Sequence, residues 1–130
     1  MVCWGWKEKE KGLVIIMGAN TERVSAALGR LGFVPWQRGY KMLCPGIAWY
    51  WRNQKTGTGQ ELYLWLGEEF GGTSSQNVRQ NIEYSIRDAW EKGSREEWAR
   101  YFPGCSRAPA NLAFIATMAA HLYGGEEETA

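Results

Sequence analysis

Apolar residues follow two kinds of pattern along this chain. Runs and alternations dominate the first half, and helical spacing dominates the second. The run 13–17 (LVIIM) is continuously apolar and rich in β-branched residues, which is typical of a strand buried on both faces. Segments 47–52 (IAWYWR) and 61–66 (ELYLWL) alternate, and the turn-rich segment 53–60 joins them. The pattern therefore predicts a β-hairpin from these two segments.

Helical spacing predicts one helix in the first half and three in the second. The first covers 21–31, where Val24, Ala27, Leu28 and Leu31 form one stripe and Gly32 follows. The second runs to about residue 92 after a capping box of Thr73 and Gln76, and a short third one follows a box of Ser94 and Glu97. The last covers 109–123 and is nearly all apolar, so we expect it to be buried.

Strands come first and helices last, and this order predicts an α+β fold. We expect one domain over 1–130, with a mostly antiparallel sheet that helices cover on one side. In this interpretation residues 1–67 are strand-rich with one helix. Residues 74–123 are helical, and residues 124–130 are a frayed acidic tail.

Tryptophan is unusually frequent, with eight in 130 residues. Trp is enriched at protein interfaces and on platforms that stack bases. If Trp51 pairs across the hairpin with Tyr63, one sheet face collects Trp49, Trp51, Tyr63 and Trp65, and the other is aliphatic. That aromatic face is a partner-binding surface if it is open. It is a second small core if the N-terminal segment folds over it, and the sequence leaves both possibilities open.

Charge is distributed unevenly although the net charge is only +1. Residues 1–67 carry +5 and residues 68–130 carry −4, and the stretch 23–60 has six basic residues and no acid. This asymmetry indicates a polarised surface. The residues that we predict to bind a partner are Trp36, Arg38, Lys41, Trp49, Trp51, Arg52, Lys55, Tyr63 and Trp65.

No motif points to catalysis, a metal or a cofactor. Cys3, Cys44 and Cys105 are widely spaced, and His121 is the single histidine, whereas a structural zinc site wants four clustered ligands. We therefore predict no catalytic residue, no metal ligand and no cofactor. Reduced thiols, the lack of a leader-like start and the lack of an apolar run of membrane length predict a cytoplasmic protein without a membrane partner.

The leading hypothesis is a non-enzymatic binding protein that docks its aromatic and basic hairpin surface on another protein or a protein–nucleic acid complex. Small chains of this kind are often inhibitors or accessory factors of phages and other mobile elements. The alternative is a single-stranded nucleic-acid binder that stacks bases on the same aromatic residues, which would make its affinity salt-dependent. A third hypothesis is a small enzyme whose nucleophile is Cys44 or Cys105. The oligomeric state stays open.

Overall fold

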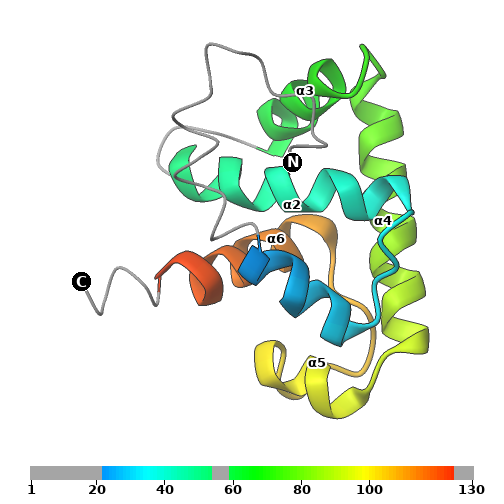
Figure 1. Cartoon of the computed structure of the whole chain (residues 1–130), viewed down its shortest axis with the longest axis vertical. Coiled ribbons are helices and arrows are strands. Elements are labelled where there is room, and N and C mark those ends of the chain that lie inside the picture. The colour runs from blue at the N-terminus through cyan, green and yellow to red at the C-terminus, as the bar shows by residue number, and fades with distance from the viewer. Residues whose placement is uncertain (1–21, 54–58, 125–130) are drawn as a thin grey trace.

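A computed structural model describes residues 22–53 and 59–124 of the chain. Every regular element within these ranges is a helix, and the helices pack around one shared core (Figure 1). In chain order they are a helix over 22–31, α2 Arg38–Asn53, α3 Gly59–Glu69, α4 Ser75–Lys92, α5 Arg95–Tyr101 and α6 Asn111–Ala119, which continues as the π-helix η2 Ala120–Gly124.

The predicted α+β fold is wrong, because the described residues contain helices and no strand. Segments 47–52 and 61–66, predicted to pair as a hairpin, belong to α2 and α3. Leu62, Tyr63 and Leu66 are buried in α3, and this spacing is that of a helix face. Six alternating residues fit a strand and one side of a short helix almost equally well, so this pattern could not separate them.

Pro45 and Gly46 are the second reason why the sequence pattern did not predict α2, since both residue types are unfavourable in a helix interior. Both are nevertheless buried inside α2. A Cβ at position 46 would lie 3.2 Å from Cδ1 of Leu66, so the small residue lets α3 pack closely on α2. Tertiary packing therefore outweighs the poor helix propensity of this pair.

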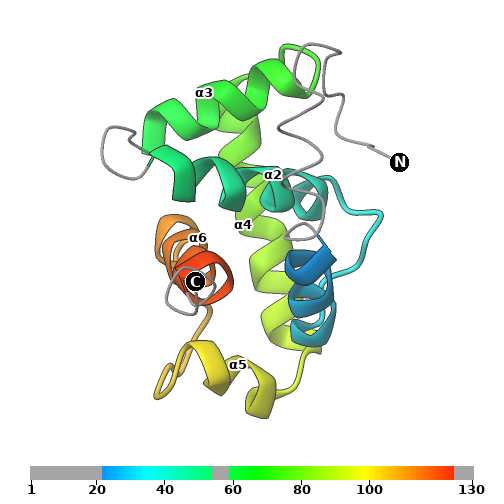
Figure 2. The same cartoon turned by 60° about the vertical axis from the view of Figure 1, so that its left-hand side comes forward.

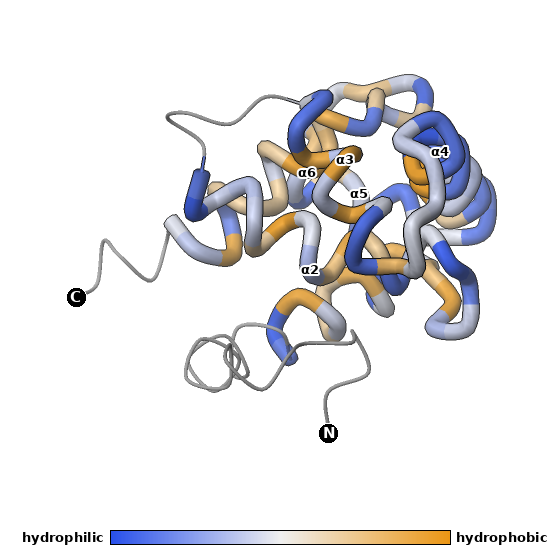
Figure 3. The backbone as a smooth tube through the Cα atoms, turned by 90° about the horizontal axis from the view of Figure 1, so that it is seen from above, coloured by the Kyte–Doolittle hydropathy of each residue, from blue (hydrophilic) through white to orange (hydrophobic). Residues whose placement is uncertain are grey.

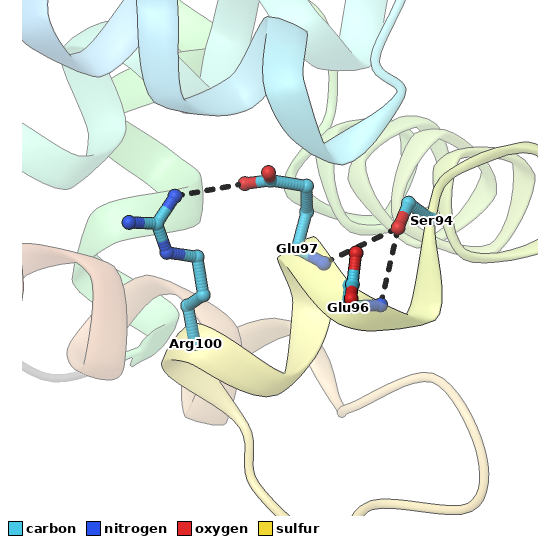
Figure 4. A network of polar contacts seen from close by, with 4 residues as sticks. All are labelled: Ser94, Glu96, Glu97 and Arg100. Atoms are coloured by element: carbon cyan, nitrogen blue, oxygen red, sulfur yellow. Dashed lines mark hydrogen bonds and ion pairs between the residues drawn. The ribbon is translucent and has the colours of Figure 1, made fainter.

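The four helices that the sequence predicted are confirmed where the structure describes them, with ends that differ by at most two residues. The cap of α4 is Ser74 and not Thr73, because the Ser74 hydroxyl accepts from the backbone N–H of Asn77 at 3.1 Å. Ser94 caps α5 as expected, and its hydroxyl accepts from the N–H groups of Glu96 and Glu97 (Figure 4). The predicted strands in residues 2–6 and 13–17 lie outside the described residues.

The core lies where α2 packs against both α4 and α6. α3 packs on α4 as well (Figure 2). The apolar positions of α4 face this core, and its hydrophilic positions face outward (Figure 3). α6 contributes Phe114, Ile115 and Met118 to the core, so the last helix is buried on one face, whereas Leu112 and Ala113 on its other side are exposed.

Much of the aromatic content is core and not surface. Trp98 is 1 % exposed, and its ring lies 5.1 Å from Trp90 and 5.7 Å from Phe114, measured between ring centroids. Phe33 and Phe102 complete this cluster. The indole N–H of Trp98 donates to the carbonyl of Leu31 at 2.9 Å, so the one polar atom of the ring is satisfied.

Candidate nucleic-acid interface

α3 and α4 are joined by a tight turn over residues 70–74. Gly71 and Gly72 in this turn have φ values of 88° and 81°, a region that side chains with a Cβ rarely adopt. The N–H groups of Gly72 and Thr73 both donate to the carbonyl of Gly67, at 2.9 and 3.0 Å. A Cβ at Gly67 would collide with the carbonyl oxygen of Thr73, so this glycine is required for the turn. The unit is a helix-turn-helix with a glycine-containing turn.

The second helix of this unit presents a polar face to solvent. The buried positions of α4 are Val78, Ile82, Ser85, Ile86 and Ala89, which fall on one side of the helix. The side chains that point away from that core are long and rich in hydrogen-bonding groups. The exposed set is Gln76, Asn77, Arg79, Gln80, Glu83, Tyr84, Arg87, Glu91 and Lys92.

Glu83 lies between two arginines on this face. Its carboxylate is 4.0 Å from the guanidinium of Arg79 and 3.4 Å from that of Arg87. All three side chains are about half exposed or more. Ion pairs of this kind are worth little in water, so both guanidinium groups can turn to a stronger anionic partner.

α4 and the turn that precedes it are fixed on one side. They contact α2 and the segment directly before α2 there. The amide nitrogen of Gln37 donates to the carboxylate of Asp88 at 3.0 Å, and its amide oxygen accepts from the hydroxyl of Ser85 at 2.8 Å. Arg38 donates to the carbonyl of Phe70 at 3.1 Å, and its guanidinium carbon lies 6.0 Å from the Phe70 ring centroid. These contacts hold the α3–α4 turn against the body of the molecule.

The connection from α5 to α6 runs along the opposite side of α4 (Figure 2). A groove of about 920 Å³ lies between α4 and this connection. Arg79, Glu83, Arg87 and Glu91 line its α4 wall, and residues 107–112 line the other. The side-chain amide of Asn111 donates to the carbonyl of Arg79 at 3.0 Å and joins the two walls.

The structure does not bring the predicted partner-binding residues onto one face. Trp49 and Trp65 stack on each other between α2 and α3, with ring centroids 6.0 Å apart, and both are half-buried. Trp51 stacks on Tyr123 at 6.3 Å, and Tyr63 is 8 % exposed at the edge of the groove beside α4.

The remaining predicted residues are mostly exposed. Trp36 is 76 % exposed before α2, and Arg38, Lys41 and Arg52 are exposed on α2. Lys55 lies outside the described residues. A role of any of these residues in binding stays a prediction, but the aromatic sheet face that was to unite them does not exist in the described structure.

The exposed face of α4 is the feature that sequence analysis missed as a candidate interface. A signal was present, because Gly71, Gly72 and the Thr-Ser-Ser run that follows stand directly before a capped helix. After a predicted hairpin, the same segment indicates only a connection between a hairpin and a helix. It becomes a helix-turn-helix signal only when residues 59–69 are known to be helical.

Comparison with known families decides what this arrangement is. Residues 24–122 match the family described as sporulation initiation factor Spo0A C terminal. The chain belongs to this family. The Spo0A C-terminal domain is a helical DNA-binding effector domain of a transcriptional regulator, and it is not an enzyme. No curated protein matches the chain.

Membership of the Spo0A C-terminal family corrects the functional hypotheses. A protein-docking inhibitor of phage type is wrong, because the family is a DNA-binding regulator and the hairpin surface is not there. Base stacking on a sheet is wrong for the same two reasons, and a cysteine enzyme is wrong because the family is a DNA-binding regulator and not an enzyme. The expectation of a non-enzymatic protein is confirmed, and the partner is nucleic acid, namely DNA.

Two further observations concern the described residues alone. None of their helices combines the length and the apolar character that crossing a bilayer requires. Their His, Cys, Asp and Glu side chains form no group of three or more that could hold a metal ion.

Proposed function

We propose that this domain binds double-stranded promoter DNA with its α3–α4 helix-turn-helix, and that the N-terminal half of α4 enters the major groove. The observation that carries the proposal is the exposed polar face of α4, which begins directly after the glycine turn. In helix-turn-helix proteins the second helix lies in the major groove with its N-terminal residues at the base edges, and the first crosses the backbone.

The chemistry of the first three turns of α4 suits the edges of base pairs. Gln76 and Gln80 carry amides that can donate to and accept from adenine, and Arg79 carries the donor pair that suits guanine. Glu83 accepts hydrogen bonds, which suits the amino group of cytosine. All four side chains are exposed, so none has to leave a packed site to reach DNA.

Hydrogen bonds that hold α4 in place support the same interface. The Gln37–Asp88 and Arg38–Phe70 hydrogen bonds tie the second helix and its turn to the segment that opens α2. A helix held in this way presents its side chains in one orientation, which lowers the entropy lost on binding.

The proposal predicts that Gln80→Ala and Arg79→Ala change which DNA sequence is preferred. Duplexes with a randomised segment are selected on the full chain, and the bound fraction is sequenced. Each variant should lose preference at one or two positions only, worth roughly 1–3 kcal/mol of discrimination per lost bidentate contact.

Arg100→Ala is the matched control for Arg79→Ala, because each arginine pairs with a glutamate on its own helix and is well exposed. Arg100 lies on α5 and should leave the preference unchanged. If the wild-type chain enriches no duplex sequence, or if both α4 variants keep the wild-type preference, α4 is not the helix that reads DNA.

A further inference from the structure

Arg107 is an exposed cation on the wall of the groove that faces α4. Within the described ranges 22–53 and 59–124, no ion pair, hydrogen bond or ring contact engages its guanidinium. The two other arginines of the groove differ from it, because Arg79 and Arg87 both pair with Glu83. Arg107 thus brings a positive charge that no carboxylate of the described residues offsets at contact distance.

The backbone next to Arg107 is fixed relative to α4. Asn111 is four residues further on, and its amide donates to the carbonyl of Arg79 at 3.0 Å. Ala108 packs against the core, and Pro109 restricts the chain between these two anchors. Arg107 is therefore held beside the exposed face of α4 and does not sit on a freely moving loop.

A helix in the major groove has a sugar-phosphate backbone along each of its sides, because that groove is only about 12 Å wide. The groove between α4 and residues 107–112 follows one side of the reading helix. A cation on the wall opposite α4, where Arg107 lies, meets phosphates and not base edges. Contacts of this kind fix the orientation of the protein on the duplex and carry no sequence information.

We propose that Arg107 binds a phosphate of the DNA strand that borders α4 on its groove side, so that the α5–α6 connection acts as a backbone clamp for the helix-turn-helix. The inference rests on the proposed function, since it takes α4 to lie in the major groove. Glu91 lines the same groove and is exposed. Its carboxylate repels the same phosphate and weakens the clamp.

The test measures the affinity of the full chain for its selected duplex at several salt concentrations. Arg107→Gln removes the charge and keeps an exposed polar side chain. It should weaken binding by the same factor on the best duplex and on a mismatched one. The slope of log affinity against log salt should become shallower by about 0.9, the value for one phosphate contact.

Two further variants make the result independent of folding. Arg100→Gln removes an equal charge on α5, away from the groove, and should keep the wild-type salt slope. Glu91→Gln removes the opposing carboxylate and should tighten binding on every duplex, a gain that a misfolded protein cannot produce.

The outcomes separate the two proposals. If the wild-type chain binds no duplex, the proposed function fails and the clamp fails with it. If the wild type binds but Arg107→Gln and Arg100→Gln have the same salt slope, the clamp alone is overturned. The clamp is also overturned if Arg107→Gln changes the preferred sequence, because Arg107 then reads bases.

Discussion

Gly39 shows how a single residue sets the distance between two helices. It lies in the first turn of α2 and is buried against α4. A Cβ at this position would overlap with the carbonyl oxygen of Asn81 and with the hydroxyl of Ser85. Only glycine lets the two backbones come this close, and the same close approach places Gln37 and Arg38 on α4 and its turn.

Gly39→Ala should therefore destabilise the protein, while Gly29→Ala should stabilise it. The first forces the helices apart, which costs roughly 1–3 kcal/mol. Gly29 is exposed within a helix, and a Cβ there meets nothing within 4 Å, so alanine should add roughly 0.5–1 kcal/mol. Urea denaturation of both variants measures the free energy of unfolding. Equal stability of the two variants would contradict the close contact.

At the scale of elements, the contact between α2 and α3 rests largely on aromatic packing. Trp49 of α2 and Trp65 of α3 stack at 26° between ring planes, and both pack against the core. Gly46 sits under Leu66 in the same contact. Since α3 is the first helix of the helix-turn-helix, this contact orients the proposed DNA-binding unit relative to the rest of the molecule.

Trp49→Ala and Trp65→Ala should lower the free energy of unfolding by roughly 2 kcal/mol or more each, because large half-buried aromatic side chains that pack against the core are lost. A double-mutant cycle should show a coupling of about 0.5–1.5 kcal/mol from the stacked pair. Trp36→Ala, at a site that is 76 % exposed, is the stability control and should change little. Stability that is unchanged in the double variant would mean that this pair is not part of the core.

At the scale of the whole molecule, Trp98 joins elements that are distant in sequence. Its indole N–H reaches the carbonyl of Leu31, 67 positions earlier in the chain. Its ring contacts Phe33 before α2, Trp90 on α4 and Phe114 on α6. The α5–α6 connection, which carries Arg107, therefore starts from a helix that is anchored in the core.

Trp98→Phe should destabilise the whole fold by roughly 1–3 kcal/mol, because the carbonyl of Leu31 loses a buried hydrogen-bond donor. Thermal unfolding followed by circular dichroism gives the shift in Tm. Trp90→Phe is the control, since Trp90 is half-buried and no described hydrogen bond uses its indole N–H. If the two variants melt at the same temperature, the Trp98–Leu31 hydrogen bond contributes nothing.

The sequence by itself determined the helices whose apolar spacing extends over several turns. The segment 75–92 and the apolar helix near the C-terminus repeat the 3.6-residue period long enough to exclude a strand. Ser94 marked the start of α5 because an N-cap is a local interaction. The lack of any catalytic motif was also a property of the sequence, and it led to the right conclusion that the protein is not an enzyme.

Only the tertiary structure showed that α2 and α3 are helices and that α3 and α4 form the proposed DNA-binding unit. Pro45 and Gly46 carry a local preference against a helix, and packing against Leu66 outweighs it. The alternating segment 61–66 has no local preference strong enough to choose, so burial against α2 and α4 chooses the helix. The helix-turn-helix and the groove with Arg107 depend on how separate elements pack, and such long-range packing leaves no short pattern in a single sequence.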